Sequence, residues 1–257
     1  MPKVKSSLRR RKVLRPRSIG GIRPHSTEDV YRILTDYYGI PKVARRMDPT
    51  SELIWTILSQ HTSDSNAEKA FAALSDRYET WMEIMKAPSD QLATVIRSGG
   101  LAQQKAPRIQ TALSLIYQRT EGFDISFLST WSLESAKSWL REIPGVGPKT
   151  AGVVLSFSLN QPAMAVDTHI YRVSKRLGLI GPKVSADEAH DILEKIVNPD
   201  KVLNFHIYLI THGRRICKAL RPLCHTCPLS ARCPSQKKLI SENDTRIPIE
   251  SLNYKPL

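Results

Sequence analysis

Amphipathic helical segments follow one another along most of the chain, and this succession most constrains its fold. Residues 30–37 place apolar side chains at helical spacing, and Ser26 and Asp29 before them form a capping-box pattern. Further helices are predicted over residues 51–59, 64–78, 102–117, 133–142, 149–158, 168–177, 186–197 and 203–213, with glycine stops at 39, 99–100 and 178. Only residues 123–127 hint at strand-like alternation, which is too short for a sheet. We therefore expect an all-α protein.

The chain length of 257 residues suits one large or two modest domains. No apolar run is long enough to cross a bilayer, and the basic N-terminus lacks the apolar stretch of a signal peptide. We expect an intracellular monomer, in the cytoplasm or nucleoid of a bacterium, or in the nucleus or an organelle of a eukaryote.

Basic residues gather at the N-terminus. Residues 1–24 hold nine of the 38 Lys and Arg and no acid. Residues 1–25 are therefore predicted to be a disordered basic tail that adds sequence-independent phosphate contacts. A solvating extension without a role and an organelle transit peptide fit the same composition.

The four cysteines all fall within seventeen residues near the C-terminus. Their spacing is Cys-x6-Cys-x2-Cys-x5-Cys, and the predicted metal ligands are Cys217, Cys224, Cys227 and Cys233. In a reducing compartment, clustered thiols usually hold metal rather than form disulfides. Structural zinc sites usually pair two short knuckles, whereas this spacing contains one. The pattern favours an iron–sulfur cluster and leaves a zinc site open.

A glycine-rich turn separates two predicted helices at residues 140–157. One helix ends near Ile143, the turn follows, and Pro148 suits the first turn of the next helix. Glycines allow positive φ and close approach of a second molecule, and free N–H groups at a helix start can bind phosphate. Many ordinary helix–turn–helix pairs carry such a turn, so taken alone it does not establish DNA binding.

Several motifs together resemble those of the endonuclease III family of DNA glycosylases. Residues 143–151 read IPGVGPKTA, close to the LPGVGxKTA signature of that family's helix-hairpin-helix. Residues 166–172 match its VDTHxxR segment, and the cysteine spacing is that of its [4Fe–4S] cluster. Residues 58–64 and 100–106 resemble its LSAQATD and GLYNSKA segments. The resemblance spans about residues 27–235, in order and at compatible spacing.

The resemblance implies two helical lobes that flank a DNA-binding groove. We predict a six-helix barrel lobe containing the hairpin over residues 50–160. Residues 26–49 and 161–235 would form the iron–sulfur cluster lobe, and residues 236–257 a C-terminal tail. The partner would be double-stranded DNA with a damaged base or an abasic site, with no membrane involved.

The resemblance also implies a bifunctional DNA glycosylase and abasic-site (AP) lyase of base excision repair that excises oxidised pyrimidines. It places the amine that forms a Schiff base at Lys149 and the catalytic aspartate at Asp167, which can also cap the following helix. A helix N-terminus disfavours a nearby cation, which favours the neutral, nucleophilic amine. We expect Asp167 to stabilise positive charge on the sugar and relay protons before β-elimination cuts the strand.

A base inside a duplex must be turned out and the gap filled. By resemblance Leu101 is the wedge, and His61 lies where the family usually has a gap-filling glutamine. Gln60 would point about 100° away if the helix continued, and Trp55 is predicted to be core. The predicted DNA-contacting residues are Gly145, Val146, Gly147, Lys149, Gln60, His61, Leu101, Lys105, Lys218 and Arg221.

The cysteine loop itself carries basic residues. Lys218, Arg221 and Arg232 lie between or beside the predicted ligands. Metal ligation would hold this loop in one shape, so that its cations lose less entropy when they contact phosphates.

Two other functions remain open. A monofunctional adenine or thymine mismatch glycosylase would share the hairpin, the aspartate and the cluster. It would lack the hairpin lysine and use a glutamate in the helix that corresponds to residues 51–64, whereas residues 53–63 contain no acid. A non-catalytic iron–sulfur DNA-binding sensor would share the architecture, and only activity separates it from an enzyme.

Overall fold

The computed structural model describes residues 23–42 and 47–244, and every regular element in these ranges is helical. The prediction of an all-α protein is confirmed. None of these helices is long and apolar enough to cross a bilayer. The helices are α1 (Thr27–Tyr38), α2 (Pro49–Ser59), α3 (Asp64–Arg77), α4 (Trp81–Lys86), α5 (Ser89–Val95), α6 (Ala102–Thr120), α7 (Leu133–Arg141), α8 (Pro148–Val153), α9 (Thr168–Leu177), α10 (Ala186–Ile196), α11 (Val202–Arg215) and α12 (Gln236–Asp244).

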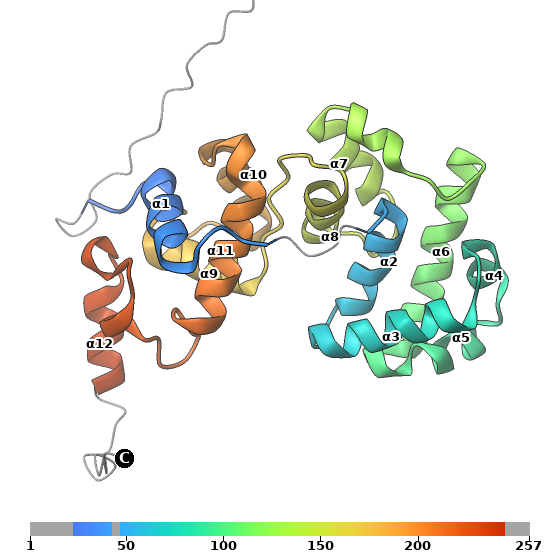
Figure 1. The fold of residues 1–257 in the computed structure, drawn as a ribbon, viewed down its shortest axis with the longest axis horizontal. Helices are drawn as coiled ribbons and strands as arrows, with labels where there is room; N and C mark the ends of the chain where they lie inside the picture. The colour runs from blue at the N-terminus through green and yellow to red at the C-terminus, as the bar shows by residue number, and fades with distance from the viewer. Residues whose placement is uncertain (1–22, 43–46, 245–257) are drawn as a thin grey trace, which may run out of the picture.

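Two helical bodies lie side by side, joined by extended chain (Figure 1). One contains α2 to α8, and the other contains α1 and α9 to α12. Each has its own apolar core: the first runs from Leu53 to Ala163, and the second joins Val30 and Leu34 to residues from Met164 to Leu229. Burial of one leucine side chain stabilises a fold by about 1.5–3 kcal/mol. Each core therefore has enough apolar side chains to hold its own helices together.

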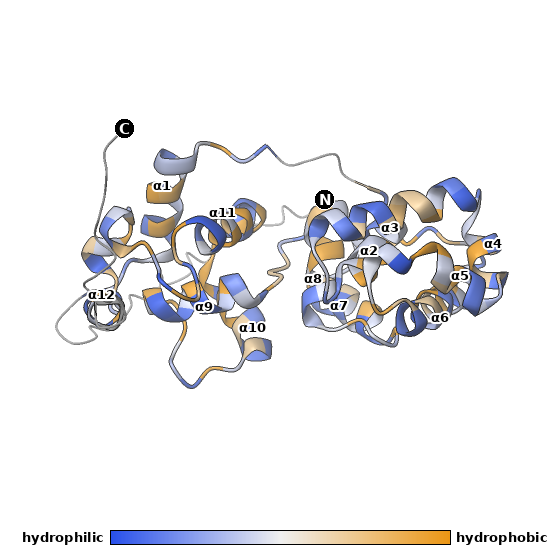
Figure 2. Cartoon of the chain, turned by 90° about the horizontal axis from the view of Figure 1, so that it is seen from below, coloured by the Kyte–Doolittle hydropathy of each residue, from blue (hydrophilic) through white to orange (hydrophobic). Residues whose placement is uncertain are grey.

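Helix ends follow the predicted signals. Ser26 and Asp29 form the capping box at the start of α1, and Gly39 ends that helix with a φ of 74°. Gly178 ends α9 in the left-handed region, with a φ of 73°. Polar and apolar residues alternate along single helices in Figure 2, as amphipathic helices require.

Three helices lie where none was predicted. The helices α4 and α5 are too short to show a clear apolar period. The third, α12, occupies the start of the predicted C-terminal tail, which corrects that assignment. Gln236 and Leu239 of α12 line a cavity together with the four cysteines, which explains why this segment is ordered.

The predicted basic tail lies outside the described residues over 1–22. Its last residue, His25, belongs to the folded part, because the ring is buried and Nε2 lies 3.1 Å from the carbonyl oxygen of Leu229. Residues 245–257 of the predicted C-terminal tail also lie outside the described ranges.

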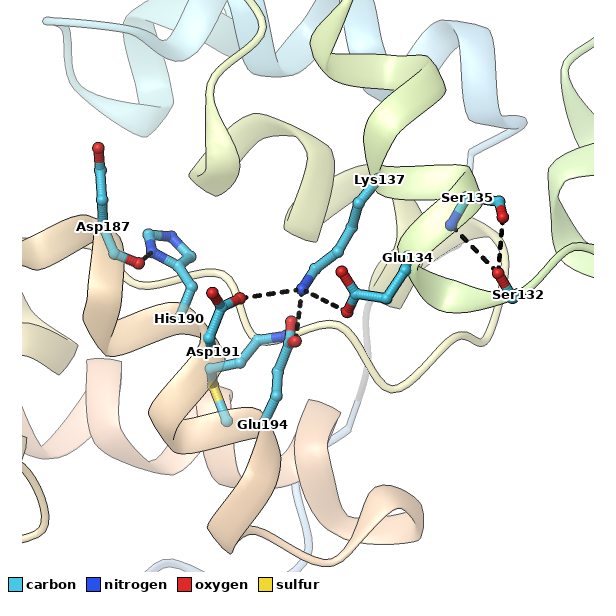
Figure 3. A network of polar contacts seen from close by, with 9 residues as sticks. Ser132, Glu134, Ser135, Lys137, Asp187, His190, Asp191 and Glu194 are labelled. Atoms are coloured by element: carbon cyan, nitrogen blue, oxygen red, sulfur yellow. Dashed lines mark hydrogen bonds and ion pairs between the residues drawn. The ribbon is translucent and has the colours of Figure 1, made fainter.

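An ionic network joins the two bodies (Figure 3). Lys137 of α7 places Nζ 2.5 Å from a carboxylate oxygen of Glu194 and 3.4 Å from one of Asp191, both on α10. The Lys137 and Glu194 side chains are only 13% and 9% exposed. Glu194 also accepts a 2.8 Å hydrogen bond from the Met164 N–H, so the same carboxylate holds the connection between the bodies.

Candidate functional site

The glycine turn lies between α7 and α8. Gly145 has a φ of 85°, a conformation that glycine adopts without strain. Gly147 caps α8 without a side-chain hydrogen bond, and no atom lies within 4 Å of where its Cβ would be. Val146 is buried in the first core and its N–H donates to the carbonyl oxygen of Ile143 at 3.0 Å, so the predicted DNA contact through this residue is corrected. The turn thus presents free backbone N–H groups to an open side.

Lys149 is the second residue of α8. Its side chain is exposed, and within the described part of the chain its amine has no hydrogen-bond or ion-pair partner. A free amine at the edge of a turn can approach an incoming molecule without first breaking a contact.

Asp167 is the N-cap of α9. Its Oδ1 accepts a 2.7 Å hydrogen bond from the Ile170 N–H, and its side chain is half-buried. The predicted cap is therefore present. One carboxylate oxygen is committed to the helix, and the residue remains partly open to solvent.

Close backbone packing connects the two predicted catalytic residues. A Cβ on Gly152 of α8 would lie 3.0 Å from the Cα and 3.1 Å from the Cβ of Ala165. Gly152 is one turn after Lys149, and Ala165 is two residues before Asp167. The helix that carries the amine therefore rests directly on the segment that carries the carboxylate.

His206 of α11 is a site residue that the sequence did not single out. Its ring is buried, and Nδ1 lies 2.8 Å from the carbonyl oxygen of Ala165. Burial lowers the pKa of His206 to about 4; the Asp167 carboxylate acts to raise this pKa and the Lys149 amine to lower it. The ring is thus neutral near pH 7, with Nδ1 donating to Ala165, and both predicted catalytic charges act on it.

Two neighbouring loops carry the residues predicted to enter DNA. Helix α2 ends at Ser59, so Gln60 and His61 are not helical and the expected 100° offset does not apply. Gln60 turns its amide toward the glycine hairpin, with Nε2 3.4 Å from the carbonyl oxygen of Gly145. His61 and Leu101 are both exposed and both have left-handed backbones, with φ of 54° and 49°. His61 is therefore freer than Gln60 to fill a gap.

Two predictions are corrected in this region. Lys105 is only 1% exposed and donates to two backbone carbonyls, so it is not available to contact phosphate. Trp55, predicted as core, is half-buried and is not among the side chains packed on either core.

The four cysteines line one cavity, together with α9, α11 and α12 residues. Burial raises the pKa of Cys227 to about 12 and that of Cys233 to about 11, and the neighbouring thiols act in the same direction. Without a bound cation these thiols stay protonated near pH 7, whereas a metal centre would favour their thiolate forms. In the described ranges, no three His, Cys, Asp or Glu side chains converge closely enough to hold a single metal ion. The donor set suits a thiolate-ligated group.

Two arginines of α9 hold the cysteine loop in place. Arg172 donates to the carbonyl oxygens of Cys217 and Gly213, at 3.0 and 2.8 Å. Arg176 donates to the carbonyl oxygen of Lys218 at 2.6 Å and to Sγ of Cys217 at 3.4 Å. One helix thus has Asp167 at its start and the cysteine loop along its side.

The basic residues of that loop divide into two groups. Lys218 and Arg221 are exposed and available to a partner. Arg232 instead donates to Asp29 of α1 at 2.6 Å, so it ties the loop to the fold. This excludes Arg232 from the expected set of phosphate contacts while Asp29 holds it.

Comparison with known proteins supplies a family assignment for this arrangement. Residues 54–199 match the family described as HhH-GPD superfamily base excision DNA repair protein. The chain is 35% identical to endonuclease III of Thermotoga maritima over 193 residues, which are 75% of this chain and 86% of that protein.

Two solved structures share the fold. A trapped endonuclease III–DNA covalent intermediate is 32% identical, with a TM-score of 0.71, and a non-covalent endonuclease III–DNA complex is 32% identical, with a TM-score of 0.72. In both cases the similarity covers 82% of this chain and 95% of the other.

Proposed function

This chain belongs to the endonuclease III family of the HhH-GPD superfamily and is a base excision repair DNA glycosylase, and we propose that it is bifunctional: it excises oxidised pyrimidines from duplex DNA and then cleaves the strand as an AP lyase. The related endonuclease III structures include DNA complexes, one of them a covalent intermediate. A covalent step in this chain requires a nucleophile and a nearby carboxylate. Lys149 and Asp167, whose charges both act on His206, are the proposed pair.

The contact between Gly152 and Ala165 is the main support for this proposed covalent step. It fixes the helix that carries the free Lys149 amine against the segment that leads to Asp167. Reacting groups held in a fixed geometry react faster than groups that must be ordered first. A lone surface lysine would need no such packing.

The proposed chemistry starts at the sugar of the damaged nucleotide. The Lys149 amine attacks C1′ while the C1′–N bond to the base breaks. The base leaves with the electron pair and takes up the proton that the attacking amine loses. Asp167 stabilises the positive charge that develops on the sugar. The sugar ring opens to a Schiff base, loss of a C2′ proton expels the 3′ phosphate, and water then hydrolyses the imine to release Lys149.

The proposed DNA contacts fall on three regions. The N–H groups of Gly145 and Gly147 bind phosphate at the hairpin, whereas that of Val146 already donates to Ile143. Leu101 and His61 enter the duplex where the nucleotide leaves. Lys218 and Arg221 bind the backbone from the cysteine loop.

We further propose that Cys217, Cys224, Cys227 and Cys233 hold a [4Fe–4S] cluster. The residues fit it because all four thiols line one cavity, and because an arginine donates to Sγ of Cys217. A bound cluster would link the four cysteine thiolates to one another and so fix the shape of the loop that carries Lys218 and Arg221. Measurement of iron and acid-labile sulfide tests this proposal: one cluster per chain supports it, and zinc without sulfide overturns it.

Borohydride trapping tests the enzymatic proposal. Wild-type protein should form a covalent adduct with a duplex that carries thymine glycol, and Lys149→Ala should abolish it. Lys86→Ala, at an exposed lysine of α4, is the control and should trap normally. Base release without an adduct would favour a monofunctional glycosylase. Binding without base release from oxidised, mismatched or abasic substrates would favour a DNA-binding sensor.

A further inference from the structure

The amine of Lys105 joins two segments that are far apart in sequence. Its Nζ donates to the carbonyl oxygen of Leu58 at 2.7 Å and to that of Gly99 at 2.8 Å. Leu58 is three residues before His61, and Gly99 is two residues before Leu101. One buried amine therefore holds the roots of both loops that carry the proposed gap-filling residue and wedge.

Both loop residues have strained backbones. His61 and Leu101 have φ of 54° and 49°, in the left-handed region that β-carbon-bearing residues rarely adopt. Such conformations cost on the order of 1–3 kcal/mol each and persist only where the surroundings enforce them. The segments that lead into the two loops are also close, since a Cβ on Gly99 would lie 3.6 Å from the carbonyl oxygen of Leu58.

Burial of the Lys105 ammonium group is energetically unfavourable, which argues for a role beyond stabilising the two loops. Lys105 is 1% exposed, and within the described ranges no carboxylate is paired with it. Burial lowers its pKa, as expected for an ammonium group that loses water. Three N–H donors on one flexible stem can, however, bind two carbonyls at once, which no apolar side chain can do.

We propose that Lys105 is a positioning residue for nucleotide extrusion: its amine fixes His61 and Leu101 relative to each other, so that the wedge and the gap filler enter the duplex together. This inference rests on the proposed function and adds to it a residue that touches no DNA. Fixing both groups before binding reduces the ordering cost at the moment when the base pair is broken.

The role is tested by comparing paired and unpaired lesions. Lys105→Met keeps the length of the side chain and removes the donors. Its single-turnover excision rate on thymine glycol opposite adenine should fall at least tenfold. On the same lesion opposite an abasic site, where no base pair must be broken, the loss should be less than threefold. Equal loss on both substrates would show a merely structural role and overturn the proposal.

A second variant covers the case in which Lys105→Met fails to fold. Gly99→Ala leaves the amine intact but places a Cβ 3.1 Å from that of Ala70, which displaces the same loop. It should show the same preference for the unpaired lesion, and an equal loss on both substrates would again refute the inference. Lys86→Met is the matched lysine control and should behave as wild type on both substrates.

Failure of the proposed enzymatic function would be seen in the wild-type protein, whereas failure of the positioning role would be seen only in the variants. If wild-type protein releases no base and forms no trapped adduct on a preformed abasic site, the enzymatic proposal fails. If wild type is active and Lys105→Met still traps on a preformed abasic site while losing paired-lesion activity, both proposals are supported. If trapping and both excision rates fall together in Lys105→Met and in Gly99→Ala, only the positioning role is lost.

Discussion

Gly152 and Ala165 touch backbone to backbone, with 3.0 Å between the position of a Gly152 Cβ and the Ala165 Cα. A Cβ contact this short is tighter than most real ones, so a side chain at position 152 would require the Ala165 backbone to move. The contact packs α8 directly against the segment before α9. It thereby constrains the position of Lys149 relative to Asp167.

Gly152→Ala should therefore impair catalysis more than folding. The added methyl group pushes α8 away from Ala165, and overpacking of this kind destabilises a fold by about 1–3 kcal/mol. We expect base excision and borohydride trapping to fall at least tenfold, measured under single turnover at a temperature well below the unfolding transition. Gly122→Ala, where the nearest atom to the new Cβ is 3.8 Å away, is the control. Normal activity of Gly152→Ala would contradict this role of the contact.

The Lys137–Glu194 pair should couple the stabilities of the two bodies. Lys137→Met leaves Glu194 largely buried without its cation, and breaking a buried pair costs about 3–5 kcal/mol. Because part of this network is exposed, we expect a loss of about 2–3 kcal/mol in urea unfolding. A double-mutant cycle with Glu194→Gln should give a coupling of at least about 1 kcal/mol.

The exposed Arg32–Asp36 pair supplies the control for that cycle. Both of its side chains are more than 60% exposed, so Arg32→Met should change the free energy of unfolding by less than about 0.5 kcal/mol. If Lys137→Met were as stable as Arg32→Met, the Lys137–Glu194 pair would not couple the stabilities of the two bodies.

The fold was predictable where a local signal decides the structure. The capping box at Ser26 and the glycine stop at Gly178 act through neighbours in sequence, and both elements end as expected. The helices α4 and α5 were missed because six or seven residues do not reveal a helical period. The order in α12 depends on a distant cavity, which no local pattern encodes.

The site was predictable only in part, for a related reason. Lys149 and Asp167 stand in motifs that can be read directly from the chain. Lys105 was mistaken for a phosphate contact because a lysine is usually exposed, and its true acceptor at Leu58 is 47 residues away. His206 was missed because its partner, Ala165, is 41 residues away.

Glu52 should make stability fall as pH rises. Burial, with Asp48 adding repulsion, raises the pKa of this carboxyl from 4.5 to about 7. The folded state therefore binds more protons than the unfolded state between these values, so its advantage is present at low pH and lost above pH 7. The loss has an upper bound of about 3 kcal/mol.

Urea unfolding at pH 5 and pH 8 measures this effect. Glu52→Gln should flatten the pH dependence and be more stable than wild type at pH 8. Glu68→Gln, at an exposed glutamate of α3, should leave the wild-type slope unchanged. If Glu52→Gln keeps the full slope, another group is responsible.

Asp167 caps α9, and its proposed chemical role can be separated from this structural role by substitution. Asn caps helices about as well as Asp, so Asp167→Asn should keep the bond to the Ile170 N–H and remain within about 0.5 kcal/mol of wild-type stability. Its carboxylate charge is lost, so the excision rate should fall at least 100-fold. Asp167→Ala should lose the same activity and, in addition, about 1 kcal/mol of stability. Excision rates and thermal unfolding of the two variants distinguish the roles, and an active, stable Asp167→Asn would show that this residue is only a cap.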